Sequence, residues 1–264
     1  MSSKIDAFHA LHQSGCFVIP NPWDRGSAIY LETLGFKAIA TTSAGFAWSQ
    51  GCPDTKMTLE QLLSHYAAIA SAVSIPVNAD FEDALAVAPE DVAKNVSRAV
   101  ETGIAGLSIE DSTRNSPEPL YPAEFAIARI RAARNAIDRS GTRVLLTART
   151  EGFIAGRPDL AETIARLQAF SAAGADCLFA PGLSKKEDVA AIVRAVAPKP
   201  LNLIGGPWIT VREAADLGVR RISVGGSLAR TAWRGFQAAA TQIAERGTFD
   251  AFAGPHFDFN AMFR

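Results

Sequence analysis

Eight short runs of apolar and β-branched residues recur along the chain, and each is followed by a longer segment with helical periodicity. The runs, which we predict to be strands, cover residues 16–19, 37–42, 76–80, 106–110, 143–147, 176–180, 201–204 and 221–224. The helical segments cover residues 24–34, 59–73, 89–102, 122–140, 159–173, 185–196, 210–217 and 227–244. This repeated strand-then-helix order predicts parallel strands joined by helical crossovers.

Eight such units in 264 residues predict a closed (β/α)8 TIM barrel, an α/β fold of about 250 residues. A doubly wound open sheet is the alternative. We expect one domain over residues 1–264, with an apolar tail over residues 247–264. That tail is too apolar for a solvated end and should dock on its own barrel or on a neighbour. Its five phenylalanines are Phe249, Phe252, Phe257, Phe259 and Phe263.

Charge and hydropathy exclude several classes of partner. The 26 basic and 27 acidic residues give a net charge of -1, and basic residues cluster only as pairs such as Arg220-Arg221, so no nucleic-acid footprint is present. No apolar run reaches the roughly 18 residues that span a membrane, and the N-terminus lacks the order of a secretory signal. We therefore expect a cytoplasmic protein with a small-molecule partner. Neither a disulfide framework nor a cysteine zinc site is indicated by Cys16, Cys52 and Cys177.

The polar residues expected at the carboxyl ends of the strands, where TIM barrels place their active sites, are mostly acidic. Asp80 and Glu110 end otherwise apolar strands, where an unpaired charge would be costly. Carboxylates that converge on one mouth need a cation, and oxygen ligands favour Mg²⁺ or Mn²⁺. A histidine-based site is not indicated, because helices or tails carry His9, His12, His65 and His256.

Three further acids, Glu82, Asp83 and Asp111, follow strands closely enough to be helix caps instead of functional groups. Arg149 ends the fifth expected strand. Its guanidinium could form a structural ion pair with Glu110, or it could bind a substrate carboxylate through two parallel hydrogen bonds.

The residue types present bear on two other chemistries, a Schiff base on lysine and the binding of a phosphate. No lysine is expected at a strand carboxyl end, which leaves no candidate for a Schiff base. The glycine pairs at 205–206 and 225–226 follow the last two strands, where they could hold a phosphate or simply make tight turns.

Seven motifs resemble, in order, those of the isocitrate lyase and phosphoenolpyruvate mutase superfamily. They are NPWD (21–24), GFKA (35–38), TTSAGFAWSQGCPD (41–54), PVNADFED (76–83), GLSIED (106–111), TARTE (147–151) and AGAD (173–176). The resemblance covers residues 15–235. It implies a barrel that binds Mg²⁺ and a 2-oxo acid, acts through an enolate-like intermediate, and exchanges its last helix between subunits of a homodimer or homotetramer.

Position by position, the resemblance implies the following roles. Metal or metal-water contacts fall to Asn78, Asp80 and Glu110. The loop that holds the substrate carboxylate corresponds to Thr42, Ser43 and Ala44. Catalytic roles fall to Asp54, near the metal, and Arg149, on the oxyanion side, with Arg114 or Asn115 as lid residues touching a transferred group.

The chain departs from the superfamily pattern at two places. The family usually has Asp-x-Asp after the third strand, whereas here the first position is Asn78, which removes one negative charge. The lyases for isocitrate and methylisocitrate carry Lys-x-Cys-Gly-His after the fourth strand, whereas residues 112–121 contain neither cysteine nor histidine. We therefore do not expect cleavage of isocitrate or methylisocitrate by that route.

The remaining residues favour a Mg²⁺-dependent carbon–carbon lyase for a small 2-oxo acid, such as an oxaloacetate-type decarboxylase. Phosphoenolpyruvate mutase or phosphonopyruvate hydrolase chemistry on a P–C bond is the near alternative. Two alternatives come from other classes. One is an enzyme for a phosphorylated intermediate held by the glycine pairs, and the other is a 2-oxo-acid binding protein with little catalysis.

Overall fold

The parallel barrel expected from the sequence is confirmed. A computed structural model describes residues 3–115, 117–254 and 257–263, so His256 lies outside the described residues. Its strands are all parallel and pair in the order β1-β8-β7-β6-β5-β4-β3-β2. They are β1 (Phe17–Ile19), β2 (Ile39–Ala40), β3 (Val77–Asp80), β4 (Gly106–Glu110), β5 (Leu145–Arg149), β6 (Cys177–Phe179), β7 (Leu201–Ile204) and β8 (Arg221–Ser223).

The seam between β1 and β2 is held by contacts just beyond the strands. The backbone N–H of Ala40 donates to the carbonyl of Pro20 at 3.0 Å. The Asn21 amide donates to the Thr41 carbonyl at 2.8 Å and accepts from the N–H of Val224 at 2.8 Å. One buried asparagine thus ties β1, β2 and the end of β8 together, which nearly closes the barrel.

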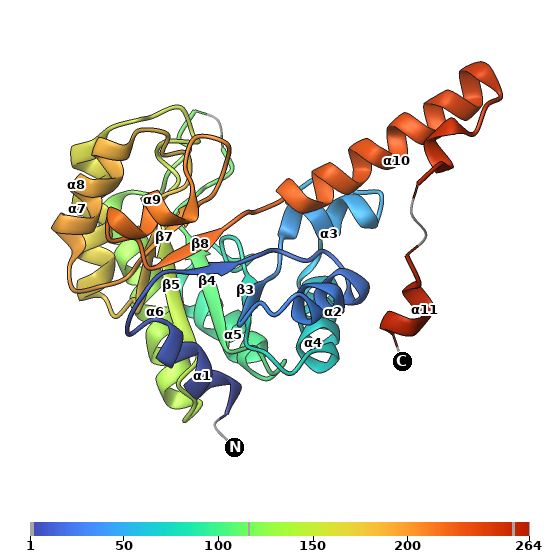
Figure 1. Ribbon diagram of the computed structural model, residues 1–264. Coiled ribbons are helices and arrows are strands. Elements are labelled where there is room, and N and C mark those ends of the chain that lie inside the picture. The colour runs from blue at the N-terminus through green and yellow to red at the C-terminus, as the bar shows by residue number, and fades with distance from the viewer. Residues whose placement is uncertain (1–2, 116, 255–256, 264) are drawn as a thin grey trace.

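Helices α1 to α9 lie around the strands, whereas α10 and the segments after it extend away from them (Figure 1). The helices are α1 (Lys4–Leu11), α2 (Arg25–Thr33), α3 (Ser43–Ser49), α4 (Leu59–Ala72), α5 (Pro89–Val100), α6 (Ala123–Arg139), α7 (Leu160–Ala172), α8 (Lys186–Val196), α9 (Val211–Asp216), α10 (Ser227–Arg246), η1 (Asp250–Phe252) and α11 (Phe259–Met262). The sequence analysis did not predict α1, α3, η1 or α11, which are all eight residues or shorter. No helix in the described ranges is long and apolar enough to cross a membrane.

Helix α1 packs against the amino-terminal end of the barrel. A capping box between Ser3 and Asp6 starts the helix, and Phe8 is fully buried. A Cβ on Gly106 would lie 2.6 Å from the Phe8 ring, so glycine is required where that ring enters the barrel. Phe8 packs with Ile19, Leu145 and other apolar residues that fill this end.

The barrel interior changes from apolar to polar toward the carboxyl ends of the strands. Above the Phe8 layer lies a buried polar set, which we call the floor ring: Asn78, Ser108, Thr147, Asn202, Arg221 and Ser223. TIM barrels usually fill their interior with bulky branched residues. The floor ring is therefore a departure that needs a functional reason.

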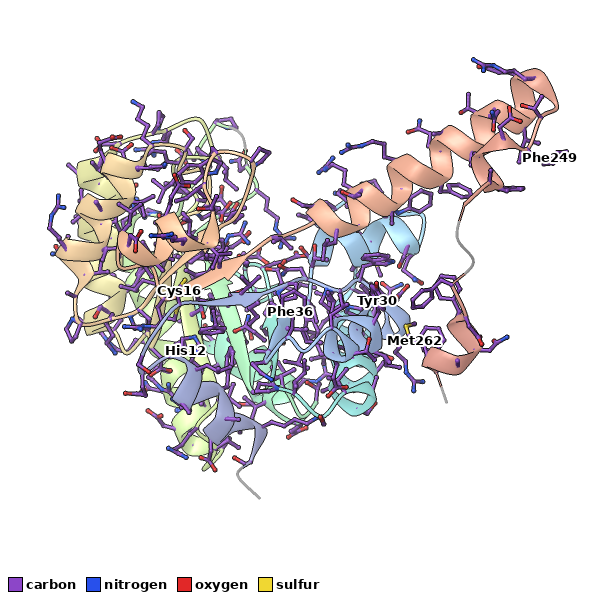
Figure 2. The ribbon with its side chains drawn as sticks, in the orientation of Figure 1. His12, Cys16, Tyr30, Phe36, Phe249 and Met262 are labelled. Atoms are coloured by element: carbon purple, nitrogen blue, oxygen red, sulfur yellow. The ribbon has the colours of Figure 1, made fainter. Side chains whose placement is uncertain are left out.

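The last helix leaves the barrel. Helix α10 projects as an arm away from the strands, and Figure 2 shows Phe249 at its far end. Within α10 only Ala229 is buried, whereas Trp233 and Phe236 are exposed. The chain then returns to α2, where the Phe257 and Tyr30 rings meet edge to face with centroids 5.7 Å apart.

Candidate active site

A cavity of about 210 Å³ opens at the carboxyl ends of the strands. It is smaller than the roughly 300–1,000 Å³ of pockets for drug-sized ligands, so it fits only a small molecule. Seven predicted site residues line it: Thr42, Ser43, Ala44, Asp54, Asn78, Asp80 and Arg149. The predicted site residues Glu110 and Asn115 are not among the residues that line it.

Asp80, at the end of β3, is fixed by the loop that follows β2. The N–H and hydroxyl of Ser43 both donate to Asp80 Oδ2 at 3.1 Å, and the backbone N–H of Asp80 donates to Thr41 Oγ1 at 2.9 Å. Thr42 begins α3 by accepting from the N–H of Gly45 at 3.2 Å. The polar run after β2 thus positions the carboxylate of β3.

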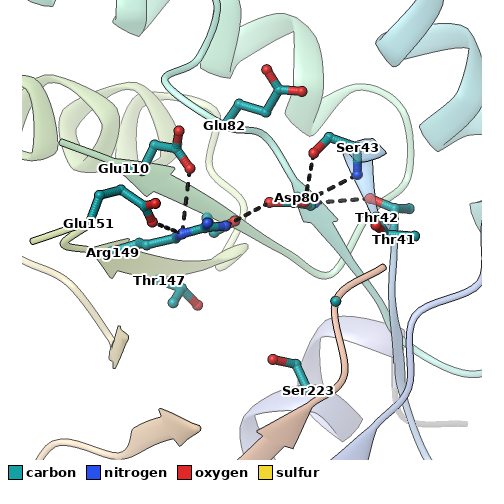
Figure 3. A network of polar contacts seen from close by, with 12 residues as sticks. Thr41, Thr42, Ser43, Asp80, Glu82, Glu110, Thr147, Arg149, Glu151 and Ser223 are labelled. Atoms are coloured by element: carbon teal, nitrogen blue, oxygen red, sulfur yellow. Dashed lines mark hydrogen bonds and ion pairs between the residues drawn. The ribbon is translucent and has the colours of Figure 1, made fainter. Parts of the chain in front are cut away.

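Arg149, at the end of β5, lies between acids on both sides (Figure 3). Its Nη1 is 3.5 Å from Asp80 Oδ1 and its Nε is 3.5 Å from Glu110 Oε2, while Glu151 accepts a close hydrogen bond from Nε. We call Asp80, Glu110, Arg149 and Glu151 the mouth cluster. The ion pair with Glu110 is present, and three carboxylates share one guanidinium.

The charges of the mouth cluster act on one another in a buried setting. Burial raises the pKa of Glu110 well above its usual range, against the pull of Arg149, and burial also raises the pKa of Glu151. Although burial alone would lower it, the charges of Glu151, Glu110 and Asp80 raise the pKa of Arg149. Burial, with the charge of Asp80, raises the pKa of Asp54. The cluster therefore holds three carboxyl groups around one guanidinium, and burial opposes their ionisation, so a cation bound beside them would favour their charged forms.

The turn after β3 is held by a buried arginine. Glu82, Ala84 and Leu85 all have positive φ angles, between 50° and 61°, which non-glycine residues rarely adopt. Arg129 of α6, 1% exposed, donates to the carbonyls of Glu110 at 3.1 Å and Ala86 at 2.9 Å, and also to that of Asp83. It therefore fastens the strained turn to the end of β4.

The helix-cap alternative for the remaining acids is wrong. Glu82 and Asp83 form ion pairs with Arg114, and burial raises the pKa of Glu82 to about 7. Asp111 accepts from the Thr150 hydroxyl at 2.8 Å and from the Glu151 N–H at 2.9 Å. None of the three caps a helix in the described residues.

Asn115 lies outside the cavity wall. It is exposed on the loop between β4 and α6, and its N–H donates to Thr113 Oγ1 at 3.0 Å. On the same loop, Arg114 reaches Glu82 and Asp83 and donates to the Thr55 carbonyl at 3.4 Å. A role for Asn115 stays a prediction.

The cavity offers oxygen ligands suited to Mg²⁺. Asn78 Oδ1 is buried without a hydrogen-bond partner, and the carboxylates of Asp54 and Asp80 line the same cavity. Within the described ranges, no three His, Cys, Asp or Glu side chains converge closely enough to hold a metal by themselves. Mg²⁺ usually binds one or two carboxylates and completes its shell with water and substrate, so this donor set fits it.

Sequence reasoning missed the most buried charge in the cavity. It treated Arg221 as half of a basic pair with Arg220, whereas Arg221 is 3% exposed and lines the bottom of the cavity. Its guanidinium donates to Asn202 Oδ1 at 2.7 Å and to Thr147 Oγ1 at 3.0 Å, and it lies 3.4 Å from His12 Nε2. The period-two alternation that places Ser223 inside also places Arg221 inside, which was the available signal.

Several known proteins are similar to this chain in sequence. A 34% identical relative is an uncharacterized protein of Mycobacterium tuberculosis, aligned over 83% of this chain and 81% of its own length. The oxaloacetate decarboxylase of Paraburkholderia xenovorans is 30% identical, over 80% of this chain and 71% of its own. The 2-methylisocitrate lyase of Aeropyrum pernix is 25% identical, aligned over 88% of this chain and 76% of its own length.

Solved structures give the same picture. A lyase/mutase candidate from Burkholderia cenocepacia superposes with a TM-score of 0.95 at 44% identity, covering 98% of this chain and 96% of that one. Oxaloacetate acetylhydrolase in complex with oxalate superposes with a TM-score of 0.88 at 27% identity, covering 99% and 94%. The profile of the phosphoenolpyruvate phosphomutase family matches residues 8–244, so the chain belongs to that family, within the PEP mutase/isocitrate lyase superfamily.

Proposed function

We propose that this protein is a Mg²⁺-dependent lyase for a small 2-oxo dicarboxylic acid, in which it breaks the bond between the carbon next to the 2-oxo carbonyl and the group beyond it, as in decarboxylation of oxaloacetate. The observation that carries the proposal is the excess of carboxylate around Arg149 in a cavity of about 210 Å³. Relatives named oxaloacetate decarboxylase and oxaloacetate acetylhydrolase support the substrate class.

The donors that would hold the metal are Asp80, Asn78 and, through water, Glu110. Asn78 and Asp80 both line the cavity, and Asn78 Oδ1 has no hydrogen-bond partner among the described residues, while Glu110 is 3.5 Å from Arg149 Nε. Held there, Mg²⁺ would supply Lewis-acid chemistry that draws electrons from the bond that breaks. Asp54 adds a further carboxylate to the same wall.

In this proposal, the loop after β2 binds the substrate carboxylate that is next to the 2-oxo group. The N–H and hydroxyl of Ser43 donate to Asp80 in this structure, and Ser43 also lines the cavity, so a substrate carboxylate would compete with Asp80 for these donors. Thr42 and Ala44 line the wall beside it. In this proposal, the three residues orient the acid so that its 2-oxo oxygen lies toward Arg149.

Arg149 stabilises the charge that develops during decarboxylation. When CO₂ leaves, the electron pair of the broken C–C bond forms the enolate, and negative charge collects on the 2-oxo oxygen. Nη2 of Arg149 has no acceptor among the described residues, so its N–H groups are available to that oxygen. Its partner Glu151 orients the guanidinium through Nε.

The reaction needs no side-chain base, which matches the lining of the cavity. Among the described residues, no lysine, histidine or cysteine lines it. Decarboxylation generates the enolate without removing a proton, and water can return the proton to carbon. Reactions that need a thiol or imidazole acid are less compatible with this wall.

Cleavage or transfer at a P–C bond is the second candidate. Phosphonopyruvate hydrolase in complex with oxalate and Mg²⁺ superposes with a TM-score of 0.87 at 26% identity, covering 99% of this chain and 95% of that one. Arg114 and Asn115, on the loop over the acidic turn, are the residues that would contact a phosphoryl group.

We also propose that the protein acts as a homodimer or homotetramer in the cytoplasm, with α10 exchanged between subunits. The exposed Trp233, Phe236 and Phe249 on and after α10 form an apolar arm that a second copy would cover. Light scattering should report a multiple of 28 kDa, and a 28 kDa species would reject the oligomer. Truncation after Gly247 should weaken assembly if the tail contributes.

A substrate panel tests the proposed reaction. Product NMR with Mg²⁺ on oxaloacetate, phosphonopyruvate, phosphoenolpyruvate and substituted malates should show pyruvate and CO₂ from oxaloacetate, and EDTA should abolish turnover. Phosphorus-containing products would favour the second candidate. Turnover that survives EDTA, or binding without turnover of any compound, would contradict the lyase.

A further inference from the structure

The floor ring contains a positive charge without a counter-charge. Arg221 forms no ion pair within the described residues, and its three contacts are to the neutral groups of Asn202, Thr147 and His12. Burial holds the pKa of His12 at about 3, so this imidazole is neutral and accepts from the guanidinium. Its other nitrogen, Nδ1, lies 2.7 Å from the Phe8 carbonyl, to which it donates in this tautomer.

A guanidinium has five N–H groups, and these contacts use three of them. The other two have no acceptor among the described residues, although the side chain is buried. Leaving a buried charge uncompensated is costly unless a ligand pairs with it. Arg221 also lines the same cavity as Asp80 and Ser43, so a molecule that enters from the mouth meets it.

We propose that the floor ring is a carboxylate subsite in which Arg221 binds the distal carboxylate of the substrate. This inference rests on the proposed function, in which the other end of the acid is held at the mouth and the distal carboxylate leaves as CO₂, so Arg221 contributes to binding and selection and not to the bond breaking. It adds that the protein selects dicarboxylic acids over monocarboxylic acids of equal length. Ser108, Asn202 and Ser223, which also line the cavity, supply the polar wall around this subsite.

Two matched ligand pairs test the subsite by calorimetry with Mg²⁺. The pairs are 2-oxoglutarate with 2-oxopentanoate, and malate with 2-hydroxybutyrate, and each pair differs only by a carboxylate in place of a methyl group. In at least one pair, we expect the dicarboxylate to bind tenfold or more tightly than its partner. Equal binding within both pairs would overturn the subsite and leave the proposed function intact, whereas no Mg²⁺-dependent binding of any acid would overturn both.

Variants of Arg221 assign the preference to this residue. Arg221→Met should remove the preference and leave the Kd of the monocarboxylate within about threefold, and Arg221→Lys should retain part of it. Arg220→Met removes the neighbouring arginine, which bonds the Gly15 carbonyl outside the barrel, and should keep the full preference. An unchanged preference in Arg221→Lys and Arg221→Met would contradict the proposal, and Arg221→Lys decides alone if the methionine variant does not fold.

A free inorganic anion such as chloride could pair with Arg221 in place of a substrate carboxylate. Melting temperatures of wild type and Arg221→Met, measured in chloride and in gluconate, separate the two. A chloride-dependent rise confined to wild type, together with no preference in either ligand pair, would assign the floor to a permanent counter-ion and overturn the substrate subsite.

Discussion

The mouth and the floor of one cavity each hold a buried arginine, but in opposite surroundings. Arg149 at the mouth faces Asp80, Glu110 and Glu151, whose charges raise its pKa. Among the described residues, Arg221 at the floor contacts neutral groups only, and burial lowers its pKa. The mouth therefore attracts a cation and the floor an anion. A dicarboxylate can meet both needs, because one end can bind a cation held at the mouth and the other end can pair with Arg221 at the floor. The local balance of charge therefore distinguishes the two arginines better than their residue type does.

The largest expected effect comes from removing the mouth carboxylate. Asp80→Ala should lower kcat/KM for the turned-over acid by about a thousandfold, equivalent to roughly 4 kcal/mol of transition-state stabilisation. It should also abolish the Mg²⁺-dependent rise in melting temperature with oxalate. Asp91→Ala, at an exposed acid paired with Lys94 on α5, is the matched control and should change neither. If Asp80→Ala kept its activity, the reaction would not depend on the Asp80 carboxylate at the mouth.

The turn that carries the acids should depend on Arg129. Arg129→Met removes donors from three buried carbonyls, so the free energy of unfolding should fall by about 3 kcal/mol. Urea unfolding measures it, with exposed Arg131→Met on the same helix as control. A decrease in the free energy of unfolding of less than about 1 kcal/mol would show that the strained turn keeps its conformation without Arg129.

The floor should respond to pH through His12. Because its pKa is about 3 when folded and near 6.5 when unfolded, the unfolded chain binds a proton that the folded chain does not. The free energy of unfolding therefore falls as the pH drops below 6.5, by up to about 1.4 kcal/mol per pH unit. His12→Gln should lose less stability than wild type between about pH 7.5 and 5.5 in urea titrations. Identical losses would show that His12 is charged in the folded protein.

The smallest expected effect comes from Asn78, the floor-ring residue nearest to Asp80 in sequence. Asn78→Asp adds a carboxylate where an amide oxygen has no partner, and it should tighten Mg²⁺ binding by about threefold to tenfold. Calorimetric titration with Mg²⁺ measures the change, and Asn95→Asp, whose amide bonds the Ala84 carbonyl outside the cavity, is the control. Weaker Mg²⁺ binding in Asn78→Asp would place the metal away from Asn78.

The barrel could be predicted from sequence because its repeat is periodic in every unit. The mouth followed from the same reasoning, since Asp80 and Arg149 end apolar strands at the edge where the active site lies. Helices α1 and α3 were missed because eight and seven residues give too little periodicity.

Side-chain direction and distant contacts explain the remaining misses. Arg220 and Arg221 look alike in sequence, yet only Arg221 points into the barrel. Glu82, Asp83 and Asp111 resembled helix caps because their partners, Arg114 and Thr150, lie on other loops. The periodicity of residues 227–244 predicted a helix but not that it would leave the barrel with Trp233 and Phe236 exposed.

The most direct test of the central claim is calorimetric titration of wild-type protein with oxalate, in the presence of Mg²⁺ and of EDTA. Oxalate presents two adjacent oxygens like a 2-oxo acid and cannot decarboxylate, so it reports on the mouth alone. The account predicts binding with Mg²⁺ and at least a hundredfold weaker binding with EDTA. Equal affinity under both conditions would contradict a cation held by the mouth carboxylates.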